Sequence, residues 1–243
     1  MSQPYLRSSD HPSVPQLTSA GLQMFSYLPE ALVEQTRAFF EATEAPLLPS
    51  QLEARDNFLF LFRLHQDQTY TDLGTLEELA QCLDEFFFAG LLMGGGDSGS
   101  DESRILRCLE LEADMFAPAP PTVSSGSYGD VHTPMPLGAS RLEPYAPGEW
   151  GLYISLDPND EDGMPFPLHS LLESLLHQMV HGFLHSFVCY CGSCKAEMSR
   201  LALLGPTFHG RLFVELLGSI TRVIREWDED LAAFYLQQDL TGV

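Results

Sequence analysis

The stretch Leu172-Glu173-Ser174-Leu175-Leu176-His177-Gln178-Met179-Val180-His181 decides the fold of this 243-residue chain. Its apolar residues recur at helical spacing, and they predict a buried helix from Leu168 to about Phe187. His177 and His181 are four residues apart, so both side chains lie on one face of that helix. Two imidazoles in this arrangement can reach the same metal ion. The stretch therefore predicts a helix that contributes ligands to a metal site.

Gln178 stands at the position that decides whether such a site can hydrolyse a peptide bond. In the H-E-x-x-H signature, a glutamate follows the first histidine and takes a proton from zinc-bound water. The amide of Gln178 keeps the size of that carboxylate but has no useful basicity. Two explanations stay open: a natural change that gives a pseudopeptidase, or a glutamate-to-glutamine variant made to trap an inactive enzyme. Either way, loss of the base is expected to slow hydrolysis by roughly 10²–10⁴-fold.

A catalytic zinc site needs a third protein ligand and an open position for water. His185 continues the histidine stripe, but on a straight helix it lies ~12 Å from His177, too far to share an ion. His209 is the better candidate, because it directly precedes a second amphipathic helix expected from Gly210 to Trp227 and can fold back over the first helix. The other histidines considered as third ligand are His11, His65, His132 and His169.

These features together resemble the SprT-like (Spartan-related) zinc metallopeptidase family. The resemblance is carried by a strand at Tyr153–Leu156, by Leu-Leu-His-x-Met-Val-His at 175–181 and by His-Gly-x-x-Phe at 209–213. It covers about Glu149 to Trp227. One departure is Phe208, which stands where the family usually has glycine.

The resemblance implies an α+β, zincin-like domain in which an active-site helix packs on a small sheet, preceded by a mostly helical N-terminal portion. It implies Zn²⁺ held by His177, His181 and His209, with Gln178 at the place of the general base. A protein or peptide is then the expected substrate or ligand, lying as an added edge strand along Trp150–Leu156. The alternatives are a zinc-loaded pseudopeptidase that binds a protein segment without cutting it, and a metal helix with a structural role only.

A second group of possible ligands follows the first helix, in Cys189-Tyr190-Cys191-Gly192-Ser193-Cys194. Cys191 and Cys194 flank a Gly-Ser turn of the kind found in metal knuckles, and His185 could supply a fourth ligand. Free thiols packed behind the helix, or a redox pair of Cys191 and Cys194, are the competing interpretations. With Cys82 and Cys108 the chain has five cysteines, an odd number that favours reduced thiols over a disulfide framework.

The charge of the chain argues against nucleic acid as a partner. Thirty-four acidic residues against 12 basic ones give a formal net charge of −22, which repels phosphate backbones. The N-terminal residues resemble neither a signal peptide nor a transit peptide, and no run approaches the ~18 apolar residues of a membrane span. An intracellular location, cytoplasm or nucleus, without membrane contact is therefore expected.

Composition divides the chain into four parts. Residues 1–20, rich in Ser, Pro and Gln, are expected to be disordered, and 21–115 to be mostly helical. Residues 116–148 form a connecting segment, rich in Pro, Gly and Ser, without expected regular structure. Residues 149–243 hold the metal-site core with its C-terminal helices. Further elements are expected as helices at Leu28–Ala42, Leu76–Phe88 (capped by Thr75 or Asp72) and 229–238, as strand or helix at 57–63 and 104–111, and as a strand at Trp150–Leu156.

Overall fold

The structure of the chain is a computed structural model, and it describes residues 11–18, 22–41, 46–68, 71–94, 105–111, 138–146, 149–160, 162–200, 203 and 209–234. Helices and a small sheet make up this part of the chain. The helices are α1 (Pro29–Phe40), α2 (Pro49–His65), α3 (Leu73–Phe88), α4 (Leu168–Phe187), α5 (Gly192–Arg200), α6 (Arg211–Arg225) and a 3-10 turn, η3 (Glu229–Leu231). The strands are β1 (Leu106–Leu111), β2 (Gly138–Ala146) and β3 (Glu149–Leu156). The α+β class expected from the sequence is confirmed.

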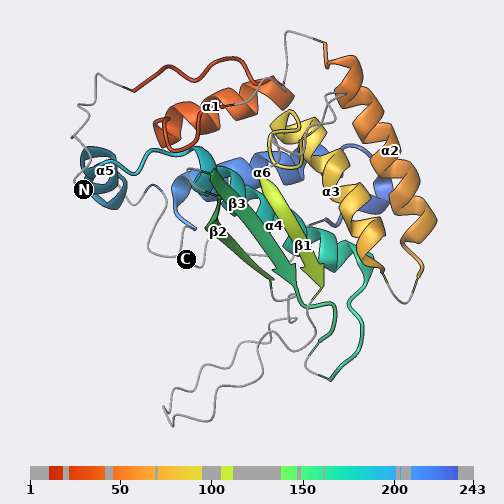
Figure 1. Ribbon diagram of the computed structural model, residues 1–243. Helices are drawn as coiled ribbons and strands as arrows, with labels where there is room; N and C mark the ends of the chain where they lie inside the picture. The colour runs from red at the N-terminus through yellow and green to blue at the C-terminus, as the bar shows by residue number, and fades with distance from the viewer. Residues whose placement is uncertain are drawn as a thin grey trace.

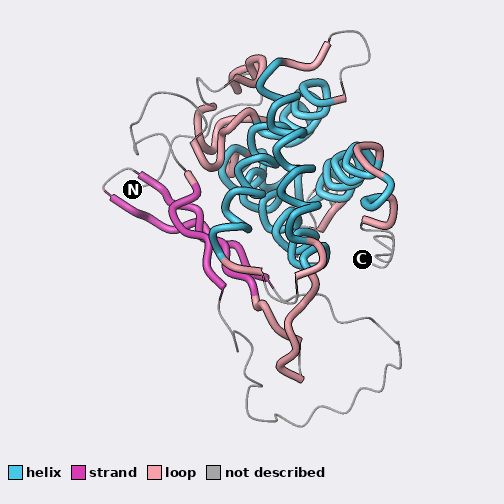
Figure 2. Tube along the Cα trace, turned by 90° about the vertical axis from the view of Figure 1, so that its right-hand side faces the viewer, coloured by secondary structure: helices cyan, strands magenta, loops and turns pink. Residues whose placement is uncertain are grey.

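The sheet lies on one side of the helices. Figure 1 shows its three strands in front of α4, and Figure 2, turned by 90°, shows strands and helices as two adjacent layers. The strand order is β1-β3-β2, with β1 parallel and β2 antiparallel to β3. Helix α4 packs on β2 and β3 through one face and on α3 and α6 through others. This position explains why α4 is apolar around most of its circumference.

Strand β3 is the centre of the sheet, as its composition explains. Leu152, Ile154 and Leu156 are buried against the helical layer, and the strand is paired along both sides. The expectation that a peptide would pair with the edge of Trp150–Leu156 is therefore wrong, because that strand has no open edge. Among the described strands, β1 and β2 form the edges.

Strand β2 corrects the expectation of an irregular segment up to residue 148. Gly138–Ala146 pairs with β3 from one end to the other, with a register shift between Pro144 and Ala146, although none of its residues is buried. An edge strand with so little burial carries no strong alternation of apolar residues, which is why the sequence did not predict it. Residues 116–137 of the expected connecting segment lie outside the described residues.

The structure decides between the two alternatives left open for residues 57–63 and corrects one expectation about the N-terminal residues. Residues 57–63 are helical and belong to α2, with Phe58 and Phe62 buried and Phe60 exposed, as a helical repeat requires. Residues 11–18, expected to be disordered, lie against the fold, and Leu17 is only 1% exposed. The predicted cap of α3 is confirmed for Asp72, whose side chain accepts a hydrogen bond from the Thr75 amide at 3.0 Å.

The helix predicted at 229–238 is tested only in its first part. Residues Glu229–Leu231 form the 3-10 turn η3 in place of an α-helix, and residues 235–238 lie outside the described residues. Helix α6 has the predicted amphipathic face, with Phe213 and Leu216 completely buried. Within the described residues, no helix is both long and apolar enough to cross a membrane.

Candidate metal centre

Three imidazoles meet where α4 passes the start of α6. His177 and His181 project from adjacent turns of α4, and His209 stands just before Gly210, the residue that caps α6. The three Nε2 atoms form a nearly equilateral triangle: 3.1 Å from His177 to His181, 3.0 Å from His181 to His209, and 2.9 Å from His177 to His209. The residues predicted as metal ligands are thus brought together, each offering the same ring nitrogen.

The spacing of these nitrogens is close to that of a zinc site. Tetrahedral zinc with Zn–N bonds of about 2.0–2.1 Å holds its nitrogen ligands roughly 3.3 Å apart. In a neutral imidazole each ring nitrogen carries either one proton or one lone pair, so of three nitrogens that face one another at about 3 Å at least two are of the same kind and cannot hydrogen-bond to each other. A cation accepts all three lone pairs at once. The geometry therefore fits a metal ion better than it fits a hydrogen-bonded histidine cluster.

Burial keeps the three histidines neutral and able to act as ligands. It lowers the pKa of His177 to about 4 and that of His181 to about 2, with the neighbouring imidazoles adding to the effect. Burial also lowers the pKa of His209. A metal ligand must be the unprotonated ring. Near neutral pH the lone pairs of the cluster are therefore available to a metal.

Phe213 forms a common support for the imidazoles. Its ring, completely buried in α6, lies with its centroid 4.9 Å from that of His177, 4.3 Å from that of His181 and 5.0 Å from that of His209. The His-Gly-x-x-Phe sequence at 209–213 thus has a physical meaning. The histidine supplies a ligand, and the phenylalanine one turn into α6 fixes the orientation of all three rings.

Gln178 directly follows His177, one of the three clustered histidines, and is 9% exposed. Its Nε2 donates a hydrogen bond to the backbone carbonyl oxygen of Gly138, the first residue of β2, at 2.9 Å. A Cβ on Gly138 would meet Gln178 Nε2 at 3.3 Å and Leu156 Cδ2 at 2.8 Å, so the absence of a side chain permits this approach. Gln178 therefore links α4 to β2, an edge strand of the sheet.

The other histidines take no part in this triangle. The ring centroid of His185 lies 5.9 Å from that of His181, and burial lowers the pKa of His185. His169 is exposed near the start of α4, and His65 ends α2. His132 lies outside the described residues.

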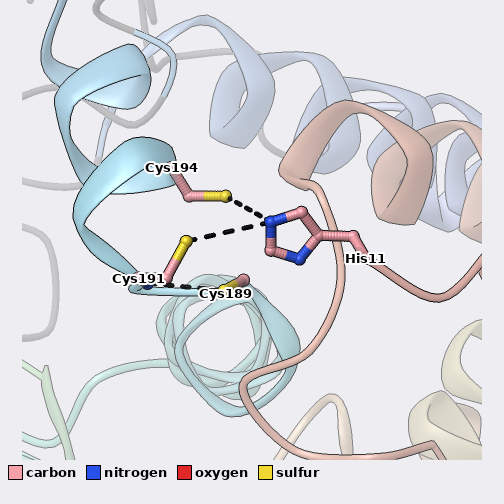
Figure 3. Close-up of side chains that lie close together, drawn as sticks. All are labelled: His11, Cys189, Cys191 and Cys194. Atoms are coloured by element: carbon pink, nitrogen blue, oxygen red, sulfur yellow. Dashed lines mark hydrogen bonds between the residues drawn. The ribbon is translucent and has the colours of Figure 1, made fainter. Parts of the chain in front are cut away.

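The cysteine-rich segment forms a second group of possible ligands, with one correction. Cys189, Cys191 and Cys194 come together as predicted, but the fourth member is His11 and not His185. His11 was considered only as a third ligand of the histidine site. It reaches the thiols from the N-terminal segment, as Figure 3 shows. No local spacing in the sequence connects His11 with cysteines about 180 residues away.

Both groups combine ligand types that favour zinc. Imidazole nitrogens suit zinc, and thiols with imidazole are typical of its structural sites, whereas magnesium and calcium take oxygen ligands.

Comparisons of the chain with models of protein families, with curated proteins and with solved structures find no match.

Proposed function

We propose that the chain binds zinc through His177, His181 and His209 in a site of metallopeptidase type that does not hydrolyse peptides as its sequence stands. The observation that carries the proposal is the triangle of three Nε2 atoms beside Gln178. Three protein ligands leave a fourth position for water or a carbonyl oxygen, as in catalytic zinc sites. The resemblance of the motifs to the SprT-like family supports the same reading.

Gln178 can orient a water or a carbonyl group but cannot hold a proton. Zinc, when bound, supplies the Lewis acidity that polarises either group. The Nε2 of Gln178 already donates to Gly138, which leaves the amide oxygen to accept a hydrogen bond. Without a base at position 178, no side chain there can accept the proton of an attacking water. None can then donate a proton to the leaving amine. Binding without turnover is the expected consequence.

The edge of β2 is the surface on which we expect a peptide to lie. Strand β3 is paired on both sides, whereas β2 ends the sheet among the described strands and begins at the residue that Gln178 contacts. An extended peptide can pair its main chain with such an edge and pass the metal site. The ligand class expected from the sequence is kept in this proposal, and its docking strand moves from β3 to β2.

The second candidate function is a zinc peptidase in which Gln178 replaces a native glutamate as a trapping substitution. The hydrogen bond to Gly138 favours the binding module, because an ionised glutamate could not donate it. The two functions differ in one variant. Gln178→Glu should gain chelator-sensitive hydrolysis if the remaining site is that of an enzyme, and it should stay silent if the protein only binds peptides.

The proposal is tested by metal analysis and by cleavage of casein as an unfolded substrate. Purified protein should lose about one zinc equivalent per chain in His209→Ala and none in His169→Ala, a matched control at an exposed position of α4. The unaltered chain should leave casein intact. Unchanged zinc content in His209→Ala would exclude the site. Chelator-sensitive cleavage of casein by the unaltered chain would exclude the proposal that a chain with Gln178 does not hydrolyse peptides.

A further inference from the structure

The group of His11, Cys189, Cys191 and Cys194 lies where the N-terminal segment crosses the end of α4. Cys189 follows the last turn of α4, and Cys191 and Cys194 stand just before and within the first turn of α5. Figure 3 shows the imidazole of His11 directed at the sulfur atoms of Cys194 and Cys191, with Cys189 beside them. All four ligand atoms lie within 4.8 Å of one another.

His11 is held in the orientation of a metal ligand. Its Nδ1 lies 3.2 Å from the backbone carbonyl oxygen of Ser26, which can only accept a hydrogen bond. The proton of the neutral ring therefore belongs on Nδ1, and the lone pair of Nε2 faces the thiols. Nε2 lies 3.1 Å from Cys194 Sγ and 3.8 Å from Cys191 Sγ. Metal-bound histidines commonly use the second nitrogen in this way.

The thiols have the spacing and the local hydrogen bonds of a metal knuckle. Tetrahedral zinc with Zn–S bonds of about 2.3 Å holds its sulfur ligands roughly 3.8 Å apart. The backbone amide of Cys191 donates to Cys189 Sγ at 3.4 Å, and Cys191 Sγ lies 3.1 Å from Ser193 Oγ. Cys189 and Cys194 are each only 4% exposed. The three sulfur atoms are thus gathered within 4.8 Å of one another, two of them on buried cysteines, which is close enough for one ion to draw them together.

We propose that His11, Cys189, Cys191 and Cys194 form a structural zinc site that fastens the N-terminal segment to the end of α4. Three sulfurs and one nitrogen complete a tetrahedron, so no position stays open for a reacting water. The site is separate from the three-histidine group and does not depend on the function proposed for it.

Backbone contacts beside the site explain what the ion would hold in place. Phe25 donates to the Ser186 carbonyl oxygen at 2.9 Å, and Cys189 donates to the Tyr27 carbonyl oxygen at 2.8 Å. A bridge between Tyr27 and Val188 continues this pairing. These few bonds join an otherwise irregular segment to the C-terminus of the metal helix. A zinc ion bound by His11 and the three cysteines would cross-link the N-terminal segment to the end of α4 and so stabilise this short backbone pairing.

Metal content of purified full-length protein tests the proposal. The unaltered chain should bind about two zinc equivalents, and His11→Ala and Cys194→Ser should each retain about one. His209→Ala should also retain about one, lost from the other site. Cys82→Ser and Cys108→Ser are the matched controls, because both cysteines lie outside the two ligand groups and should leave both metals bound.

Cobalt(II) added to the metal-free chain distinguishes the two sites without relying on one variant. Thiolate-to-cobalt charge-transfer absorption should appear in the unaltered chain and in His209→Ala, and it should be absent from Cys194→Ser. Its absence from the unaltered chain would overturn the proposal, as would a Cys191–Cys194 disulfide in freshly isolated protein. In His11→Ala, amide hydrogen exchange at Ser26 and Tyr27 should be at least about tenfold faster. Unchanged exchange would show that no ion fastens the segment.

Discussion

Leu152 of β3 fills the space beside Gly182 of α4. A Cβ on Gly182 would lie 3.0 Å from Leu152 Cδ1 and closer still to Cδ2, and Leu152 is completely buried. Helix α4 thus approaches the central strand more closely than any other residue at position 182 would allow. Because His181 directly precedes Gly182, this contact also sets where one imidazole of the candidate metal site lies relative to the sheet.

Gly182→Ala should therefore destabilise the protein. Overpacking a buried contact of this kind costs about 1–3 kcal/mol, and the free energy of unfolding in denaturant measures it. Gly218→Ala is the control, because Gly218 lies inside α6 with no heavy atom within 4 Å of an added Cβ. Alanine should stabilise that helix by up to about 1 kcal/mol. Equal effects at the two glycines would contradict the close packing of α4 on β3.

Asp84 of α3 predicts a second stability effect, at the junction between helices and sheet. Its buried carboxylate accepts hydrogen bonds from the amides of Leu92 at 3.1 Å and Met93 at 2.7 Å. The Leu92 carbonyl in turn accepts from the amides of Ile105 and Leu106, where β1 begins. One acidic side chain thus orders the turn that positions an edge of the sheet.

Asp84→Asn should lower the free energy of unfolding by about 1–3 kcal/mol. The NH2 group of asparagine would face one of the two backbone N–H groups, and it cannot accept a hydrogen bond from it. Asp67→Asn makes the same chemical change at an exposed position after α2 and should have little effect. Denaturant unfolding of both variants provides the measurement. A small effect at Asp84 would show that the turn does not depend on its carboxylate.

The elements that could be predicted from sequence are those whose signal is local. Helix α4 was predicted from Leu168 to about Phe187 and has these bounds, because its apolar repeat is long and follows Pro167. Strand β3 was likewise evident from its aromatic and branched residues. Strand β2 was missed, since its residues bury little surface, and the central place of β3 depends on partners distant in sequence.

The same distinction explains the two ligand groups. His177 and His181 could be paired from helical spacing alone, and His209 followed from its place before α6. His185 seemed the natural fourth ligand for the cysteines because it is close in sequence. The structure brings His11 instead, since the N-terminal segment folds back along the end of α4. Such a contact is a property of tertiary packing and leaves no periodic mark in the sequence.

Asp72 allows a prediction about pH. Its carboxylate accepts from the amide of Thr75 at 3.0 Å and from its hydroxyl at 2.8 Å, and these bonds lower the pKa of Asp72. A depressed pKa in the folded state means that the stabilisation is present above the unfolded value of about 3.9 and is lost as pH falls through the folded value. Asp72→Ala should cost about 0.5–2 kcal/mol at pH 7.

The difference in unfolding free energy between the unaltered chain and Asp72→Ala should therefore shrink in acid. Asp72→Asn keeps an oxygen acceptor that does not titrate, so its difference from Asp72→Ala should stay nearly constant with pH. Denaturant unfolding of the three proteins from pH 7 to about 3 measures both trends. If the difference in unfolding free energy between the unaltered chain and Asp72→Ala grew in acid, the ionised carboxylate of Asp72 would not be the stabilising form, and the proposed cap would be contradicted.

The bond between Gln178 and Gly138 predicts how the protein responds to a glutamate at position 178. An ionised carboxylate there would place an acceptor 2.9 Å from a carbonyl oxygen that also only accepts. In metal-free protein near neutral pH, Gln178→Glu should therefore lower the free energy of unfolding by about 1–3 kcal/mol. Gln68→Glu adds the same charge at an exposed position and is the control, with an expected change within about 0.5 kcal/mol.

This measurement also bears on the origin of Gln178 without requiring any activity. If glutamate were the residue around which the site is built, Gln178→Glu should be as stable as the unaltered chain or more stable, because Gly138 and the start of β2 would accommodate the carboxylate. A loss confined to position 178 instead indicates that the helix and the edge strand are matched to an amide. Denaturant unfolding of the two variants in the presence of a chelator separates these outcomes, since bound zinc would otherwise stabilise a carboxylate beside it. We expect the loss, because the donated hydrogen bond to Gly138 is the only one between Gln178 and β2 that the described residues show, and glutamate cannot replace it while ionised.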